Sequence, residues 1–355
     1  MNKIVFFMNN LSGGGAERVM SIISNRLANN YDIIVYSLKH TENIYGINSK
    51  VKIKYLYNYG ELDKKIKRIR KIRKVIKSEK PDIIISFEYF VNISVIISNF
   101  FLRNTLIISE RNDPHSEGNN VKNIRNFLYR FCNLLVCQTP DSKSYFPKYI
   151  QKKTIIIPNP VKKDLPERYI GKRNKEIVNF CRFSKQKNLP LLIDAFEKVR
   201  KKYKDYKLVL YGDGILKKQI ENYIKEKKLT DSIVLKPFDK EVHNKILKSA
   251  MFVSSSDYEG ISNSMLEAMA IGLPTICTDC PCGGARMIIN NGINGILVNV
   301  GDKEELSKKI ILLIENKEIA NKISLNGIKV RDDYSEEKIS QLWINAIEEF
   351  DRYNK

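Results

Sequence analysis

The chain has 355 residues, of which 43% are hydrophobic and 28% are charged. This balance is typical of a folded globular protein and excludes a disordered chain or a multi-span membrane protein, and the length suits two domains. The formal net charge of +21 implies an anionic partner or a general lysine bias of the composition.

The first residues run directly from Lys3 into an apolar stretch at positions 4–7, which predicts a strand and not a signal peptide. No apolar stretch approaches the ~20 residues that a membrane span needs. The six cysteines, without a secretory signal, favour reduced thiols. Cys277, Cys280 and Cys282 lie close together, but no histidine lies near them to complete a metal site. We therefore expect a cytoplasmic protein without a bound metal.

Short β-rich runs alternate with helical patterns along the whole chain, which is typical of parallel sheets built from β-α-β units. The first helix is expected to open near Ala16. In the first half we expect strands at residues 4–7, 33–37, 51–56, 83–87, 105–109, 134–137 and 154–157. In the second half we expect strands at residues 177–180, 207–211, 233–235, 252–254, 275–277 and 295–298. Asn188 and Asp302 are predicted N-caps of helices in this second series.

The periodicity stops around Pro158 and Pro160, and residues 161–175 are polar and aperiodic, so they are interpreted as a linker. The sequence therefore predicts an α/β protein of two doubly wound, Rossmann-like domains, at residues 1–160 and 176–334. A C-terminal helix within 335–355 is expected to pack back on the body. Because doubly wound sheets bind ligands at the carboxyl ends of their strands, we expect the two sheets to present these ends to a shared cleft.

Residues 64–77 combine positive charge with helical periodicity. Lysines and arginines there are interleaved with the apolar residues Ile66, Ile69, Ile72, Val75 and Ile76. A basic amphipathic helix of this kind is typical of attachment to an anionic membrane surface, although a core-packed helix with a solvated charged face has the same pattern. Nucleic-acid binding has less support, because no helix-turn-helix, zinc module or RNA-binding aromatic signature accompanies the charge.

The strongest chemical signal is the string DYEGISNSMLEAMAIGLP at residues 257–274. It predicts a loop with Glu259 and Gly260, then a helix from near Asn263 to Gly272. Glu259 and Glu267 have seven residues between them, so they lie about two helical turns apart on the same side. The amide groups at the start of this helix, at its positive dipole end, suit a diphosphate.

This string resembles the motif of the family-4 retaining glycosyltransferases, which have the GT-B fold: a Glu, seven residues, a second Glu, and Ala-Met-Ala-x-Gly-x-Pro. The resemblance covers most of the second half. It implies that Glu259 contacts hydroxyl groups of the donor sugar and that Glu267 holds the nucleotide ribose. The backbone of the intervening turn is then expected to face the diphosphate, at Gly260, Ile261, Ser262 and Asn263.

Arg182 and Lys187 resemble the family's Arg/Lys pair that neutralises the donor diphosphate. Gly212 and Gly214 match its second glycine turn, which makes Gly212 a donor-binding candidate. Two cations and a helix N-terminus would stabilise the negative charge that develops on a departing diphosphate without a metal. Two positions depart from the family pattern. Cys181 stands where a glycine is usual, and residues 283–287, GGARM, lack an acid found in many members.

In the first half, residues 13–18, GGGAER, resemble the opening of family members that build bacterial surface polysaccharides. We assign Gly14 and Gly15 to donor binding, and Glu17 to acceptor contact or to capping of the helix. The spacing lacks Gly-x-Gly-x-x-Gly, which argues against a nicotinamide site. In related enzymes the loop after the strand at 105–109 helps to hold the donor sugar or the acceptor, which makes Arg111 an acceptor-side candidate and His115 a catalytic candidate.

The resulting hypothesis is a retaining hexosyltransferase. It takes a hexose or N-acetylhexosamine from a UDP-sugar, without a cofactor, and passes it to an oligosaccharide acceptor in bacterial surface polysaccharide synthesis. We expect this acceptor to be lipid-linked. We expect the enzyme to sit peripherally on the inner face of the cell membrane. A UDP-sugar epimerase of the same two-domain layout is the alternative enzyme, and a non-catalytic binding or scaffold protein is the alternative outside enzymes.

Overall fold

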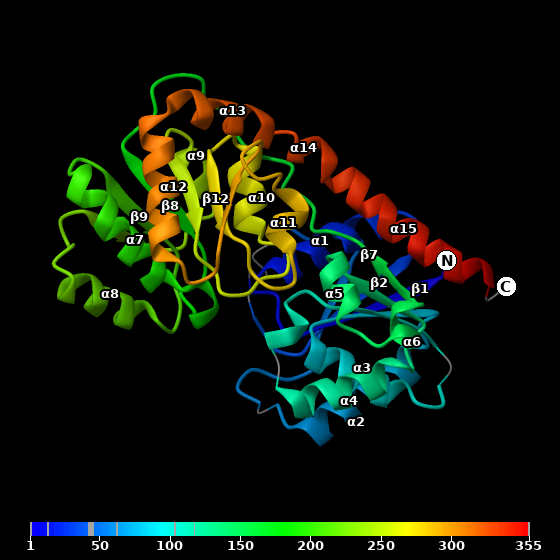
Figure 1. Cartoon of the computed structure of the whole chain (residues 1–355). Helices are drawn as coiled ribbons and strands as arrows, with labels where there is room; N and C mark the ends of the chain where they lie inside the picture. The colour runs from blue at the N-terminus through cyan, green and yellow to red at the C-terminus, as the bar shows by residue number, and fades with distance from the viewer. Residues whose placement is uncertain are drawn as a thin grey trace. The chain divides into compact units, whose positions relative to one another are not determined.

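The computed structural model describes residues 2–12, 14–41, 46–61, 63–102, 104–116 and 118–353. The chain forms two compact units (Figure 1): Met1–Pro160 together with Glu336–Lys355, and Val161–Ser335. Both units are parallel α/β sheets covered by helices, as the sequence predicts. Within the described ranges, none of the helices has the length and hydropathy needed to cross a lipid bilayer.

The N-terminal unit contains a parallel sheet of seven strands in the order β3-β2-β1-β4-β5-β6-β7. Its strands are β1 (Lys3–Met8), β2 (Asp32–Ser37), β3 (Lys52–Tyr55), β4 (Ile83–Phe87), β5 (Thr105–Ser109), β6 (Leu134–Cys137) and β7 (Thr154–Ile156). Its helices are α1 (Gly15–Leu27), α2 (Lys65–Glu79), α3 (Tyr89–Asn99), α4 (Asn119–Tyr129), α5 (Pro140–Ser144), α6 (Lys148–Gln151) and α15 (Glu336–Tyr353), with the 3-10 turn η1 (Pro114–Ser116). The order of the strands reverses between β1 and β4, where doubly wound sheets bind their ligands.

The C-terminal unit contains a parallel sheet of six strands in the order β10-β9-β8-β11-β12-β13, which reverses between β8 and β11. Its strands are β8 (Glu176–Phe180), β9 (Lys207–Tyr211), β10 (Ile233–Lys236), β11 (Met251–Ser254), β12 (Thr275–Thr278) and β13 (Ile296–Val298). Its helices are α7 (Leu189–Lys202), α8 (Lys217–Glu226), α9 (Val242–Ile246), α10 (Asn263–Ala270), α11 (Gly284–Ile288), α12 (Lys303–Glu315), α13 (Lys317–Gly327) and α14 (Val330–Asp333), with the 3-10 turn η2 (Lys185–Lys187).

The strands lie within one residue of the bounds expected from the sequence. Central strands such as β4 are buried along their whole length, and β4 is apolar at every position except Ser86, because helices cover both faces of a parallel sheet. The two predicted N-caps are also present. The side chain of Asn188 accepts a hydrogen bond from the backbone N–H of Leu191, and that of Asp302 accepts one from Glu305.

Residues 161–175, which the sequence pattern assigned to a linker, belong to the C-terminal unit. The backbone N–H of Val161 donates to the carbonyl of Tyr334 at 2.7 Å. The guanidinium of Arg173 donates to the carbonyls of Leu247, Ser249 and Gly272. The segment is aperiodic because it packs through these polar contacts and not through one apolar face.

The last helix, α15, returns to the N-terminal unit and contacts α1. Its Trp343 is completely buried, and its ring centroid lies 5.8 Å from that of Phe87 at the end of β4. The end of the chain therefore contributes a large aromatic side chain to the core of the first unit.

Replacing Trp343 by Ala is expected to destabilise the N-terminal unit by about 3–5 kcal/mol, because it leaves a large cavity beside Phe87. The neighbouring Leu342 is 43% exposed, and Leu342→Ala should change the free energy of unfolding by less than about 1 kcal/mol. Urea unfolding followed by circular dichroism measures both. Equal effects of the two substitutions would contradict the packing of α15.

Candidate active site

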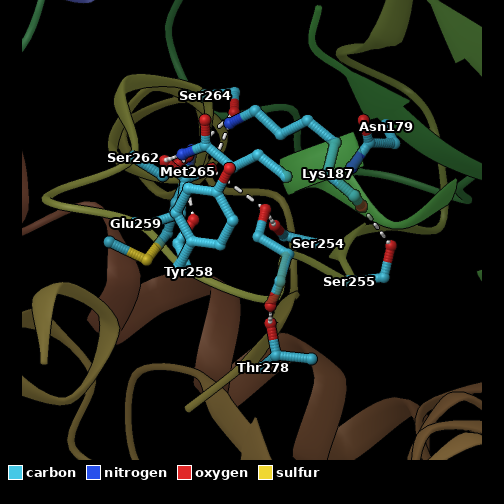
Figure 2. A network of polar contacts seen from close by, with 12 residues as sticks. Asn179, Lys187, Ser254, Ser255, Tyr258, Glu259, Ser262, Ser264, Met265 and Thr278 are labelled. Atoms are coloured by element: carbon cyan, nitrogen blue, oxygen red, sulfur yellow. Dashed lines mark hydrogen bonds and ion pairs between the residues drawn. The ribbon is translucent and has the colours of Figure 1, made fainter. Parts of the chain in front are cut away.

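The loop between β11 and α10 contains the motif that the sequence singled out. The helix begins at Asn263, and its N-cap Ser262 accepts a hydrogen bond from the backbone N–H of Met265 (Figure 2). It ends at Ala270, and two residues later Gly272 adopts a left-handed conformation with φ of 72°. The predicted start of this helix is therefore confirmed, and its end lies two residues before the predicted Gly272. One of its first-turn amide groups is already satisfied by Ser262.

Glu259 is the centre of a polar network that joins this loop to the loop after β8 (Figure 2). Its carboxylate forms an ion pair with Lys187, which lies in η2. Gln186 Nε2 donates to Oε2 at 3.0 Å, and Ser256 Oγ donates to Oε1 at 2.9 Å. Both charged side chains are largely withdrawn from solvent, so the carboxylate is fixed by three donors before any ligand arrives.

Further hydrogen bonds between the same two loops fix their relative position. Asn188 Nδ2 donates to Asp257 Oδ1 at 2.7 Å, and Ser255 Oγ donates to the carbonyl of Lys187 at 3.0 Å. Thr278 of β12 donates to the carbonyl of Ser256 at 2.6 Å (Figure 2). Three neighbouring strands thus share in holding Glu259 and Lys187 in one arrangement.

The ion pair also sets the charge of the site. Burial alone would lower the pKa of Lys187, but the adjacent Glu259 carboxylate outweighs this effect and raises it. Burial raises the pKa of both Cys181 and Cys280 to about 12. At neutral pH the site therefore contains a lysine cation and neutral thiols, and these cysteines are not activated nucleophiles.

Arg182 follows β8 directly and is exposed. No hydrogen bond or ion pair of its guanidinium is found among the described residues. Its backbone position is defined by its neighbours, because Cys181 N–H donates to Tyr211 O and Phe183 N–H donates to Asp213 O. The hydrogen bonds of its neighbours thus fix the backbone at Arg182, which lies in the same loop after β8 as Lys187.

Two glycines allow the turn after β9 to approach this arginine loop. Gly212 and Gly214 have φ of 147° and 155°. A Cβ atom built on Gly212 would overlap the carbonyl of Cys181, and one built on Gly214 would overlap that of Phe183. Their observed role is close backbone packing. The sequence had assigned Gly212 to donor binding, which stays a prediction.

Glu267 lies within α10, is buried, and is paired with a residue that sequence reasoning missed. His243 Nε2 lies 2.7 Å from Glu267 Oε2, and the imidazole ring packs edge-on against Phe180 with centroids 5.6 Å apart. His243 belongs to the short helix α9, 24 residues earlier in the chain. The sequence offered only one weak signal for it, a histidine within an otherwise lysine-rich segment.

The candidates of the N-terminal unit gather at the carboxyl edge of its own sheet. Gly14 is the N-cap of α1 and Gly15 is the first residue of that helix, which is the next element after β1. The carboxylate of the buried Glu17 folds back over Gly14, where a Cβ atom would overlap it. This position suits the capping role that the sequence had left open for Glu17.

Arg111 and His115 follow β5 on the same edge. Arg111 donates to the side chain of Asn159, and burial lowers its pKa to about 9, so it remains a cation at neutral pH. His115 Nδ1 lies 2.9 Å from Asp113 Oδ1, and its side chain is half exposed. The structure therefore divides the predicted site residues into two sets, one for each unit.

The described residues contain no group of three or more His, Cys, Asp or Glu side chains arranged to hold a metal ion. Cationic charge on the carboxyl edge of the C-terminal sheet comes instead from Lys187 and Arg182. With the fixed carboxylate of Glu259 and the start of α10, this arrangement suits a ligand that carries both phosphate and hydroxyl groups.

Family comparisons give the same class of protein. Residues 162–330 match the family model "Glycosyl transferases group 1", and residues 13–165 match "Glycosyltransferase Family 4". The two matches adjoin and together span nearly the whole chain. The chain belongs to this family of glycosyltransferases and has the GT-B type of fold.

Particular relatives act in, or are named for, glycan synthesis. A Campylobacter jejuni α-1,4-N-acetyl-D-galactosaminyltransferase, named for an undecaprenol-diphosphate-linked acceptor, is 25% identical over 98% of this chain and 99% of its own. The amylovoran biosynthesis glycosyltransferase AmsD of Erwinia amylovora is 25% identical over 97% of this chain and 99% of its own. The solved structure of Anabaena HepE with UDP and glucose has a TM-score of 0.83 at 18% identity, covering 98% of this chain and 100% of its own.

Gly284→Ala is expected to destabilise the C-terminal unit by about 1–3 kcal/mol and to displace the Gly260 turn, because the added Cβ would overlap the carbonyl oxygen of Gly260. Gly46→Ala is the control, since nothing lies within 4 Å of a Cβ atom there. Thermal unfolding of the two variants provides the comparison. An unchanged Gly284→Ala protein would show that α11 does not pack on the turn as observed.

Proposed function

We propose that this glycosyltransferase moves a hexose or N-acetylhexosamine from a UDP-sugar to a lipid-linked oligosaccharide in bacterial surface polysaccharide synthesis, with retention of configuration. The observation that carries the proposal is the convergence of Arg182, Lys187, Glu259 and the start of α10 on one sheet edge. The relatives named for N-acetylgalactosamine transfer and amylovoran synthesis, and the fold neighbour with UDP, support this choice of donor and acceptor.

The chemistry follows from the charges. Cleavage of the bond between the anomeric carbon and the diphosphate leaves negative charge on the leaving group. The exposed Arg182 and the cationic Lys187 are the groups that would stabilise this charge, together with backbone amide groups at the start of α10. In this proposal the two cations and the amide groups stabilise the leaving group without a metal ion. The UDP-sugar donor is a substrate, and no other cofactor takes part.

Glu259 would bind the donor sugar as a hydrogen-bond acceptor. Its carboxylate is held by Lys187, Gln186 and Ser256, so its orientation is independent of the ligand. An anionic donor would give Lys187 a second negative partner, on the diphosphate. Lys187 would then contact both the Glu259 carboxylate that binds the sugar and the diphosphate leaving group, and so hold the two in a fixed relation.

The residues of the N-terminal unit are assigned to the remaining contacts. Gly14 and Gly15 would bring backbone close to the donor, and His115 would act at the reacting sugar. Arg111 and Glu17 would lie on the acceptor side, although the fold of Glu17 over Gly14 favours its role at the helix start.

We further propose that the acceptor is met at the inner face of the membrane, to which α2 attaches. Arg68, Ile72 and Ile76 of this helix are buried, so the core-packed interpretation of its inner face applies as well. Glu61 forms ion pairs with Lys67 and Lys71, which removes two lysines from the outward charge. Exposed cations without a partner in the described ranges remain along the helix at Lys65, Arg70, Lys74 and Lys77.

Lys187→Ala and Glu259→Ala are each expected to lower turnover at least ~10²-fold, since each removes a group that stabilises or positions the reacting charges. Lys185→Ala, an exposed lysine of the same η2 turn, should leave turnover unchanged. Initial rates with a panel of UDP-, GDP- and ADP-sugars measure the effect and identify the donor. Normal rates in both site variants, or an epimerised donor without acceptor, would overturn the assignment.

His243→Ala is expected to raise the KM for the UDP-sugar at least ~10-fold with little change in kcat, because Glu267 would lose the partner that positions it. His243→Gln keeps a nitrogen donor and should restore most of the affinity. Calorimetric titration with UDP separates this positioning role from loss of folding. The hypothesis fails where the Ala and Gln variants bind UDP as tightly as the unmodified protein.

A further inference from the structure

The N-terminal unit exposes aromatic side chains in an unusual concentration where α3 and α4 end. Phe101 is 96% exposed, Phe127 is 55% exposed and Phe131 is 47% exposed. Their rings form a chain of contacts through Phe100, with centroids 5.0 Å apart for Phe100–Phe131, 5.8 Å for Phe127–Phe131 and 6.4 Å for Phe100–Phe101. These four residues are called the aromatic ridge.

The ridge is continuous with the basic helix α2, because α3 packs against both α2 and α4 (Figure 1). The Arg73 guanidinium donates to the carbonyls of Ser98 and Phe100, both at 2.9 Å. Ile66, Arg70 and Lys77 lie within about 60° of Arg73 around the helix axis, and all three are exposed. One side of α2 therefore extends the ridge with an isoleucine and two cations.

The charged residues in the chain segments that form the ridge have a single sign. Residues 89–109 and 118–140, which contain α3, α4 and the ends of both helices, include no Asp or Glu. Arg130 lies over the ring of Phe127, 4.9 Å from its centroid, and over Tyr149, 5.4 Å from its centroid. A partner for this surface must have an apolar region that accepts the aromatic rings and negative charge directly beside that region.

The backbone also favours exposure of the ridge. Phe101 has φ of 65°, a left-handed conformation that bulky residues rarely adopt. Strain of this kind persists only where the surrounding structure holds it, and it is concentrated at functional positions. The residue in this conformation is also the most exposed member of the ridge.

We propose that the aromatic ridge inserts into the interfacial layer of an anionic lipid bilayer while Arg70, Lys77 and Arg130 contact the lipid phosphates. Aromatic rings prefer the boundary between head groups and acyl chains, and neighbouring cations add attraction to anionic lipid. This inference rests on the peripheral membrane location proposed above and adds an insertion surface to it. Charge alone would give an attachment that salt removes, whereas inserted rings resist salt.

The test is co-sedimentation of the full chain with phosphatidylcholine vesicles that contain or lack phosphatidylglycerol, at low and high salt. The triple variant Phe101→Ser, Phe127→Ser and Phe131→Ser should lose binding at least ~10²-fold and show none at high salt. The unmodified protein should retain part of its binding there. Ile170→Ser with Leu325→Ser, exposed apolar residues of the other unit, is the matched control and should bind normally.

Charge is tested separately with Arg70→Glu and Lys77→Glu together, which should weaken binding only to vesicles with phosphatidylglycerol. The same change of net charge at the exposed Lys218 and Lys225 of α8 is the control and should have little effect. Circular dichroism of every variant verifies folding, and donor turnover with a soluble acceptor reports separately on the active site.

Three outcomes would overturn the inference. If the triple Ser variant binds vesicles normally and the Arg70→Glu, Lys77→Glu variant does not bind, the membrane is contacted by α2 and not by the ridge. Sugar transfer without vesicle binding by the unmodified protein would remove the membrane location but leave the donor site intact. A dimer that the triple Ser variant converts to a monomer, without vesicle binding in either, would identify the ridge as a contact between copies of this chain.

Discussion

The ion pair between Lys187 and Glu259 is the interaction on which the geometry of the active site depends. It joins the loops that follow β8 and β11, the two strands between which the order of the C-terminal sheet reverses. A charge pair withdrawn from water is costly unless its remaining hydrogen-bonding capacity is used. Gln186 and Ser256 supply those bonds, so the pair is stable enough to define one position for each loop. A site built in this way is organised before the ligand binds, which is the condition for electrostatic stabilisation of a leaving group.

Backbone packing makes that ion pair possible. The turn at Gly212 and Gly214 approaches the arginine loop more closely than any residue with a Cβ would allow, and Gly284 approaches Gly260 in the same way. The loop after β9 therefore approaches the loop after β8, and the segment after β12 approaches the loop after β11, without intervening side chains. The charged side chains of Lys187 and Glu259 extend from these closely packed loops. In the N-terminal unit glycines likewise stand at the start of a helix, since Gly14 and Gly15 open α1, the next element after β1.

Sequence patterns predicted the strands, the helix that contains Glu267 and the caps at Asn188 and Asp302, because each depends on periodicity or on a residue a few positions away. Features that depend on distant segments were not predictable. His243 meets Glu267 only through the packing of α9 on α10, and the aromatic ridge combines residues from the ends of two helices. The segment 161–175 was misinterpreted as a linker for the same reason, since its contacts are polar and distant in sequence.

The effect of the net charge of +21 depends on where the charged side chains lie and not on the total. Surface charges interact over only about 8 Å at physiological ionic strength, so each cation acts on what lies directly beside it. Lys67 and Lys71 are matched by Glu61, and Lys187 is matched by Glu259. Pairing of this kind converts some lysines into structural groups and leaves others available to an anion. Arg182 on one unit and Arg70 with Lys77 on the other are among the exposed cations without a partner in the described ranges. A nucleotide diphosphate and a lipid phosphate would each meet a cation there that no carboxylate neutralises.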